Sequence, residues 1–255
     1  MRSRSTAGDG QTADQSERRF ALVAAFGLLF MALLAPFAQF GVLQTLIVPA
    51  DAAATTANLL VSAGIFRAAI AAFLIIAILD IVVAWGLYIL LRPTNASLAL
   101  LVAWLRVAYA AVFAYALVNL LDVAQLLQGT KAAGLSPTQV DAQAASSIAS
   151  FNDGWDLALA VFGFHLVGLG ALLFKSVDFP KFLGALVTLA GVGYLADSFG
   201  KILVPGYTLT ISAFTFIGEA LLIVWLFKRA IRGSQPSDSP RVIGSPALAT
   251  EAVGS

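Results

Sequence analysis

The sequence predicts an all-α protein whose helices cross a membrane six times. Hydrophobic residues make up 60% of the 255 residues and charged residues only 11%, whereas soluble domains are about 45–50% apolar and about 25% charged. The apolar residues form continuous runs rather than the short alternating segments of barrel strands. The basic residues between these runs gather on one side, as they do in multi-pass membrane proteins.

Six runs are apolar and long enough to cross a bilayer, which takes about 20 residues at 1.5 Å rise each. They lie at about Phe20–Leu43, Ser62–Leu91, Ser97–Leu121, Trp155–Phe174, Phe182–Ser198 and Ser212–Phe227. The apolar run that begins at Phe20 is longer than the core of a secretory signal, so we interpret it as the first span. The last two runs are the shortest, and both are expected to extend toward the turn at Val204-Pro205-Gly206.

Basic residues outside the spans set the predicted orientation. With the N-terminus inside, the outer loops hold only Lys131 and Lys201. The inner segments hold Arg2, Arg4, Arg18, Arg19, Arg92, Lys175, Lys181, Lys228, Arg229, Arg232 and Arg241. This excess predicts that both termini are cytoplasmic and that the protein lies in a bacterial inner membrane. We therefore expect a six-span domain over residues 18–232 between two disordered tails, 1–17 and 233–255, which have little to bury.

The outer loop between the third and fourth spans is predicted to contain a short amphipathic helix. Ser136-Pro137-Thr138-Gln139 has the N-cap residue, the first-turn proline and the capping-box glutamine of a helix start. Val140, Ala144 and Ile148 then recur every four residues. This helix either covers the outer mouth of the bundle or rests on the bilayer surface.

Composition excludes several kinds of site. The chain has no cysteine and a single histidine, His165, which excludes disulfides, thiolate metal sites, cysteine nucleophiles and multi-histidine centres. The sequence indicates no metal site, identifies no cofactor and contains no Gly-x-Ser-x-Gly motif. With a net charge of +1, it has no basic surface for nucleic acid. The predicted partners are the lipid bilayer, a small solute or cation, and another membrane protein or a second copy of the chain.

Ionisable residues inside the predicted spans are the main candidates for a functional site, because each costs about 2.5–3.5 kcal/mol at the bilayer centre. Asp80 precedes the turn at Thr94 by nearly the same number of residues as Arg106 follows it. Both are therefore about 18–21 Å from the turn along their helices and are expected to meet. This pair is either a buried ion pair that locks spans two and three together or part of a functional site.

His165 and Glu219 also lie near the middle of their spans. If they face each other or share a cavity, they can relay a proton or coordinate a cation. In the alternative, His165 is hydrogen-bonded to a carbonyl or to Tyr194, and Glu219 is protonated or paired with Arg106. In span five, Gly184, Ala190, Gly191 and Gly193 predict close helix packing.

Near the outer ends of the spans, five charged residues are predicted to lie at similar heights: Arg67, Asp153, Asp156, Asp197 and Lys201. Asp153 and Asp156 either favour the dipole at the start of span four or form an acidic vestibule that attracts cations or pairs with Arg67.

Several ordered motifs resemble a bacterial membrane-protein family catalogued as domain of unknown function 4386. They are Phe66-Arg67, Leu79-Asp80, Val83-Ala84-Trp85, Leu91-Arg92-Pro93, Ala103-Trp104-Leu105-Arg106, Phe151-Asn152-Asp153-Gly154-Trp155, Phe162-Gly163-Phe164-His165-Leu166, Pro180-Lys181-Phe182-Leu183-Gly184, the stretch from Ala190 to Ser198, and Gly218-Glu219 with Trp225. The resemblance covers about residues 18–232. Lys181 stands where arginine is expected, and Phe182 where a smaller or indole side chain is expected. The resemblance implies a multi-span inner-membrane protein with no assigned activity, and it implies that Arg67, Asp80, Arg106, Asp153, His165, Asp197 and Glu219 form one pattern.

Three hypotheses follow for function. In the first, which we favour, the protein binds or transports a cation, a proton-coupled solute or a small amphiphile in a polar cavity that opens outward beneath Ser136–Ser150. In the second, it is an accessory subunit of a larger membrane complex. In the third and least favoured, it is an intramembrane enzyme acting on a lipid or isoprenoid. There, Glu219 or His165 acts as general base, and Asp197 or Asp153 holds a metal.

Overall fold

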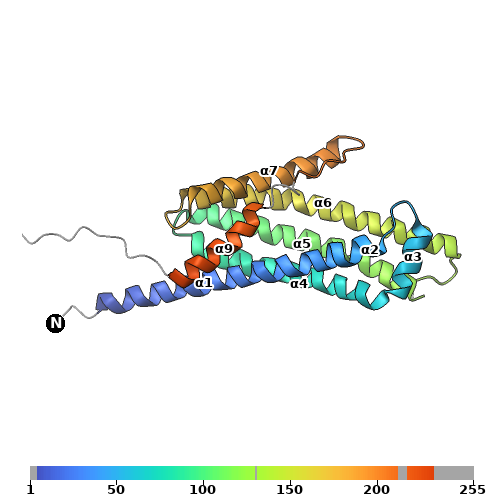
Figure 1. Cartoon of the computed structure of the whole chain (residues 1–255), viewed down its shortest axis with the longest axis horizontal. Helices are drawn as coiled ribbons and strands as arrows, with labels where there is room; N and C mark the ends of the chain where they lie inside the picture. Colours follow the sequence, from blue (N-terminus) through green and yellow to red (C-terminus); the bar gives the residue numbers. More distant parts are fainter. Residues whose placement is uncertain (1–4, 130, 212–216, 233–255) are drawn as a thin grey trace, which may run out of the picture.

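The computed structural model describes residues 5–129, 131–211 and 217–232, and it contains only helices and loops in those ranges (Figure 1). The elements are α1 (Ser5–Pro36), the π-helical segment η1 (Phe37–Leu43), α2 (Gln44–Leu46), α3 (Ala52–Val61), α4 (Ala63–Leu91), α5 (Ala96–Leu127), α6 (Pro137–Lys175), α7 (Lys181–Leu203) and α9 (Ile217–Arg232). The predicted all-α fold is confirmed.

Five helical segments are long and apolar enough to cross a membrane. They are Arg18–Leu46, Ala63–Leu91, Ala96–Leu127, Pro137–Lys175 and Lys181–Leu203. They correspond to the first five predicted spans, so the composition and the helices fit a multi-pass membrane protein. The predicted sixth span begins at Ser212. Residues 212–216 lie outside the described part of the chain, and α9 alone has 16 residues.

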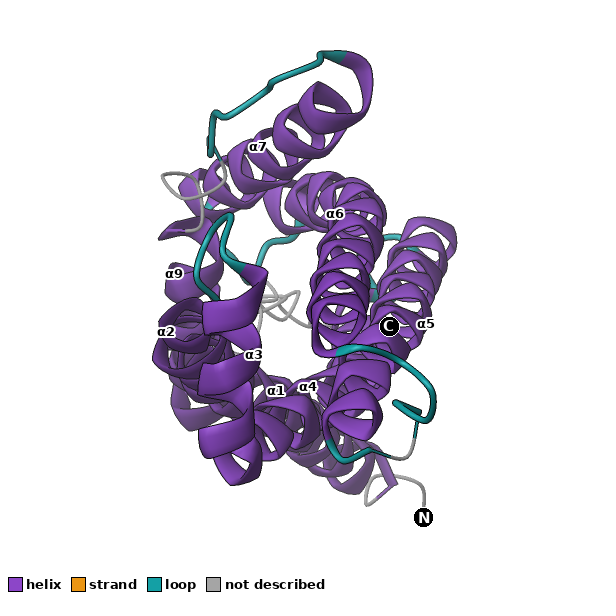
Figure 2. Cartoon of the chain, turned by 90° about the vertical axis from the view of Figure 1, so that its right-hand side faces the viewer, coloured by secondary structure: helices purple, strands orange, loops and turns teal. Residues whose placement is uncertain are grey.

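The long helices pack in sequence order and close into a bundle at one end. Helix α4 contacts α1 and α5, α6 contacts α5 and α7, and α9 contacts both α7 and α1. The N-terminal part of α1 and the C-terminal part of α9 lie at the same end of the molecule (Figure 1). At the opposite end, α3 packs on α6 (Figure 2).

Side-chain caps fix several helix starts. The Asp51 carboxylate accepts a hydrogen bond from the Ala54 N–H at 2.8 Å, and the Asn95 amide oxygen accepts one from Leu98 at 3.0 Å. The capping box predicted at Ser136 and Gln139 is present at the start of α6.

The prediction of a separate short helix between the third and fourth spans is wrong, because α6 runs without a break from Pro137 to Lys175. Residues 136–150 therefore extend the spanning helix and do not form a cover beneath which a cavity opens. Gly154 does not interrupt the helix, and it lies against α5. A Cβ atom on Gly154 would be 2.9 Å from the Cβ of Ala116, so the glycine allows the two helices to approach closely.

Helix α1 begins at Ser5, inside the segment 1–17 that was predicted to be a disordered tail. For residues 1–4 and 233–255, which lie outside the described part of the chain, the predicted disorder stays a prediction.

Glycines bring α6 and α7 into backbone contact at two heights. A Cβ on Gly163 would lie 3.0 Å from the Gly191 carbonyl oxygen, and one on Gly170 would lie 2.6 Å from the Gly184 carbonyl oxygen. The small-residue face predicted for the fifth span therefore packs closely, and Gly184 and Gly191 are the residues that permit it.

Candidate functional site

Three polar side chains of neighbouring helices lie at one depth in the bundle. Each is separated from one end of its helix by nearly the same number of residues: Asp80 from the end of α4, Arg106 from the start of α5, and His165 from the end of α6. At 1.5 Å rise each is about 15–17 Å from its helix end, which is about half the 30 Å thickness of a hydrocarbon core. We call Asp80, Arg106, His165 and the nearby Glu219 the charge layer.

Asp80 and Arg106 form the ion pair that their spacing predicts. Nη2 of Arg106 lies 2.7 Å from Oδ1 of Asp80, and the two side chains are 2% and 0% exposed respectively. Both carboxylate oxygens of Asp80 are buried and neither has a hydrogen-bond partner among the described residues, so the contact with Arg106 is an ion pair. The guanidinium also lies over the ring of Phe162 at 5.5 Å and against the thioether of Met31 in α1.

The hydrogen bonds of His165 fix its protonation. Its Nε2 is 3.2 Å from Nη1 of Arg106, and its Nδ1 is 2.8 Å from the Val102 carbonyl oxygen. Arginine can only donate and a carbonyl can only accept. Nε2 must therefore accept, Nδ1 must carry the proton, and the ring must be neutral. Of the contacts predicted for His165, the structure therefore shows the hydrogen bond to a backbone carbonyl, that of Val102. With both ring nitrogens engaged, the ring has no free nitrogen for a relay to Glu219.

Glu219 enters the charge layer from α9. It lies close enough for the charges of Arg106 and Asp80 to act on it, and its carboxylate is within hydrogen-bonding reach of the Tyr194 hydroxyl of α7. Its Oε1 is buried and has no hydrogen-bond partner among the described residues. The preceding Gly218 sets this position, because a Cβ there would lie 2.6 Å from the Leu186 carbonyl oxygen.

An aromatic layer lies about one helical turn from the charge layer, toward the α3 end of the bundle. Tyr109 and Phe162 have ring centroids 4.7 Å apart, and Phe162 meets Tyr194 edge-on at 5.5 Å. Sequence reasoning selected Tyr194 but missed Tyr109, Phe162 and Met31. The spacing contained a usable signal: Tyr109 follows Arg106 by three residues and Phe162 precedes His165 by three. Because α5 and α6 are antiparallel, both offsets point toward the same end of the bundle.

Comparison with known proteins identifies the family. A family model described as Domain of unknown function (DUF4386) matches residues 23–230. The chain belongs to this family. It is also 34% identical to an uncharacterized protein of Archaeoglobus fulgidus over 168 residues, which are 66% of this chain and 86% of that protein. No solved structure matches the chain. The resemblance seen in the sequence motifs is confirmed.

The remaining predicted site residues of this DUF4386 chain lie toward the α3 end of the bundle. Arg67 and Asp153 are exposed, and Asp153 lies about 18 Å from His165 along α6. The neighbouring Asp156 pairs with Lys201 at 2.7 Å. This ion pair joins α6 and α7, and the predicted vestibule stays a prediction.

Asp197 holds the loop that follows α7. Its Oδ1 accepts hydrogen bonds from the Tyr207 hydroxyl and the Ile211 N–H, each at 2.9 Å. Partial desolvation and the Asp197 carboxylate raise the pKa of Tyr207. Gly200 makes room for the ring, because a Cβ there would lie 2.5 Å from Tyr207. The contacts of Asp197 are thus those of a loop anchor.

The space around His165 is tightly filled. The void between α4, α5 and α6 that is lined by Ala84, Val102 and Leu172 is too small to hold a water molecule. The described residues include no group of three or more side chains placed to hold a metal ion. Within the charge layer, Glu219 is the residue that is only partly buried and has a carboxylate oxygen without a hydrogen-bond partner among the described residues.

Proposed function

We propose that this DUF4386 protein binds a positively charged solute at the charge layer, in the middle of the membrane. Its charge balance carries the proposal. Two carboxylates, Asp80 and Glu219, face one guanidinium, Arg106, while the hydrogen bonds of His165 keep that ring neutral. With both carboxylates ionised, the cluster has one surplus negative charge, which is costly away from water. A bound cation or a proton removes that cost.

Glu219 is the group that receives the cation. Asp80 is 0% exposed and already ion-paired with Arg106, whereas Glu219 is only partly buried and its Oε1 has no hydrogen-bond partner and no ion pair among the described residues. A cation at Oε1 gains a charge-assisted contact without breaking an existing bond. The Asp80–Arg106–His165 group then acts as a fixed support that positions the charge next to Glu219.

Ligand-dependent thermal stability tests this proposal. The protein is placed in lipid nanodiscs and melted by intrinsic fluorescence, which the four tryptophans supply. Sodium, potassium, ammonium and choline chlorides are compared at constant ionic strength. Wild type should be stabilised by at least one cation, by about 1.4 kcal/mol at ten times its dissociation constant.

Two carboxylate-to-amide variants complete that test. Glu219→Gln should lose the stabilisation, and Asp141→Asn, which changes a partly exposed residue near the outer end of α6, should keep it. If no cation stabilises the wild type, or if Glu219→Gln responds as the wild type does, there is no cation site at Glu219.

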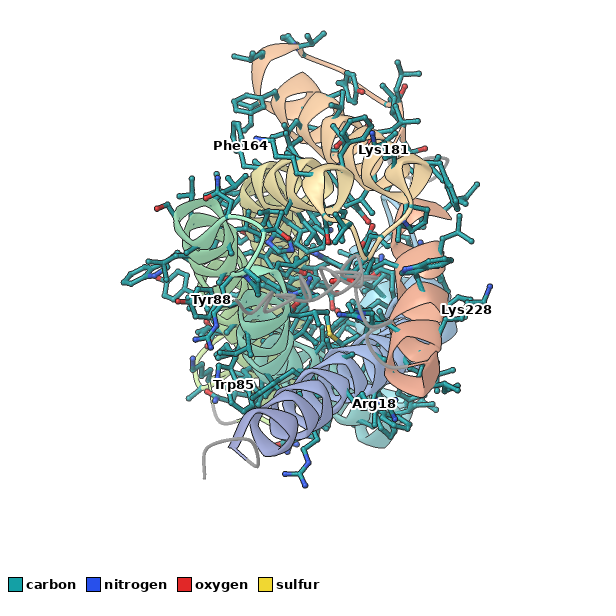
Figure 3. The ribbon with its side chains drawn as sticks, turned by 90° about the vertical axis from the view of Figure 1, so that its left-hand side faces the viewer. Arg18, Trp85, Tyr88, Phe164, Lys181 and Lys228 are labelled. Carbon is teal, nitrogen blue, oxygen red and sulfur yellow. The ribbon has the colours of Figure 1, made fainter. Side chains whose placement is uncertain are left out.

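We further propose six spans, with α9 forming the inner part of the sixth, and both termini in the cytoplasm of a bacterial inner membrane. Arg18, Lys181 and Lys228 surround the end of the bundle where α1 enters (Figure 3), which supports the orientation from the positive-inside rule. At the other end, Lys131 and Lys201 each pair with a carboxylate.

A second candidate function, an accessory subunit of a membrane complex, is supported by the length of α6. Its 39 residues extend about 58 Å, nearly twice the hydrocarbon core, so about 18 residues at its N-terminal end project beyond the bilayer and offer a surface for another protein. Purification from the native host in mild detergent tests this candidate. Recovery only as a monomer or homodimer contradicts it.

A further inference from the structure

We propose that the cation bound at Glu219 is an organic ammonium ion, meaning a protonated amine or a quaternary ammonium group with carbon substituents, rather than a metal ion. The inference rests on the proposed function and adds the chemical class of the ligand. It follows from the groups of the charge layer and the aromatic layer around Glu219, whose Oε1 has no hydrogen-bond partner among the described residues. These groups combine carboxylates with aromatic and thioether side chains.

The structure already holds one delocalised cation against these groups. The Arg106 guanidinium carbon lies 5.5 Å from the centroid of Phe162, and Nη2 lies 4.0 Å from Sδ of Met31. Aromatic faces attract cations through the ring quadrupole, most strongly where water is excluded, and thioether sulfur is a soft, polarisable contact. These side chains therefore form surroundings that suit a large, weakly hydrated cation.

Tyr194 extends the same surroundings to Glu219. Its ring meets Phe162 edge-on at 5.5 Å, and its hydroxyl is within reach of the Glu219 carboxylate. A cation at Glu219 Oε1 thus lies beside a phenol ring that adjoins the ring carrying Arg106. Phe162 also stacks on His165 at 5.5 Å, so the aromatic layer and the charge layer form one continuous packed unit.

The ligand groups among the described residues favour this class over metal ions. Calcium, for example, binds through six to eight oxygen atoms at short range, whereas the described side chains on the Glu219 side of the layer are one carboxylate, one phenol and carbon-rich surfaces. An ammonium group needs only one carboxylate for its charge, and its methyl or methylene groups are stabilised by aromatic faces.

Choline and its uncharged carbon isostere, 3,3-dimethyl-1-butanol, distinguish charge from shape. With the wild-type protein in nanodiscs, choline should raise the melting midpoint, while the isostere at the same concentration and sodium at the same ionic strength should not. Tyr194→Leu should weaken choline binding by about two- to thirtyfold, the range for loss of one cation–π contact. Tyr194→Phe, which keeps the ring, should bind within about threefold of wild type. Tyr115→Leu is the matched control, because Tyr115 is 77% exposed on α5.

The outcomes separate this inference from the proposed function. If sodium or potassium stabilises the protein in a Glu219-dependent manner and choline does not, the site binds cations but the ligand class is wrong. Equal stabilisation by choline and the isostere also overturns the class, since charge then plays no part. A wild-type choline affinity in Tyr194→Leu overturns the role of the aromatic layer. Stabilisation by none of the cations overturns both proposals.

Discussion

Replacing Arg106 with methionine should be among the most destabilising single changes in the bundle. Methionine keeps much of the apolar stem of arginine but removes the guanidinium, which bonds Asp80 at 2.7 Å and His165 at 3.2 Å. Asp80 is then a carboxylate with no counterion at 0% exposure. Removing one member of a buried ion pair typically costs about 3–5 kcal/mol, which changes the unfolding equilibrium by more than a hundredfold.

The charge layer predicts that Asp80→Asn costs less than Arg106→Met. Without the Asp80 charge, Arg106 still has Glu219 nearby and the cluster becomes neutral. The loss is then that of one charge-assisted hydrogen bond, about 1.5–3 kcal/mol. The double variant Asp80→Asn/Arg106→Met should be more stable than Arg106→Met alone. Asp80→Asn removes the buried negative charge that Arg106→Met would leave without a counterion.

Reversible unfolding in mixed micelles of increasing SDS content, followed by tryptophan fluorescence, measures these free energies. Arg67→Met is the matched control, since Arg67 is exposed near the outer end of α4, and it should change stability by no more than about 0.5 kcal/mol. Equal costs for Arg106→Met and Asp80→Asn, or strictly additive costs in the double variant, would refute the charge balance on which the cation site depends.

Three further changes test other parts of the structure. Glu219→Gln should leave stability within about 1 kcal/mol of wild type, because it removes the surplus charge and keeps an acceptor for Tyr194; a loss of about 3 kcal/mol in SDS unfolding would instead indicate a structural ion pair. Gly170→Ala should cost about 1–3 kcal/mol through overpacking, since its Cβ would lie 2.2 Å from the Thr188 hydroxyl oxygen. In Gly64→Ala, no neighbouring heavy atom lies within 4 Å of the new Cβ, so the change should be neutral or stabilising in the same assay. If Gly64→Ala and Gly170→Ala change the free energy of unfolding equally, the close packing at Gly170 is contradicted. Because the chain has no cysteine, single-cysteine variants report topology directly. A membrane-impermeant thiol reagent added outside intact cells should label Gln143→Cys, at an exposed position of α6, and not Thr94→Cys, and the reverse pattern would invert the proposed orientation.

The ion pair was predictable from the sequence because it depends only on helix arithmetic. Asp80 and Arg106 lie at similar distances from one turn, and antiparallel neighbours of equal rise must bring such positions to the same depth. The His165 contacts were not predictable in this way. Counting residues placed His165 near the middle of its span. Its choice between Glu219, Tyr194 and a carbonyl depends on helix rotation, which is set by packing and is not given by hydropathy.

The error in the outer loop has a related cause. The capping box at Ser136 correctly marked a helix start, but the short helix was expected to end near Ser150, before the apolar run that begins at Trp155. A rise in hydropathy does not end a helix, because an exposed polar helix and a membrane span can be parts of one continuous backbone helix. Gly154 lies between the two predicted segments and does not break α6, because it packs closely on Ala116. Hydropathy and the capping box therefore do not distinguish one long helix from two shorter ones.

The arrangement of the charge layer explains why one of its two carboxylates is suited to binding. Asp80, Arg106 and His165 lie on three helices that pack against one another in sequence order, and each has at least one short polar contact within the group. Changing the protonation of His165 would break one of its two bonds. Glu219 lies instead on α9, whose contacts are with α7 and α1 and which is tied to the α6–α7 loop by Arg229 and Asp178 at 3.0 Å. A charge change at Glu219 therefore acts on a helix other than the three that hold the fixed group. A cation bound there is held by α9 and α7 together, so its binding and the packing of these two helices must be coupled.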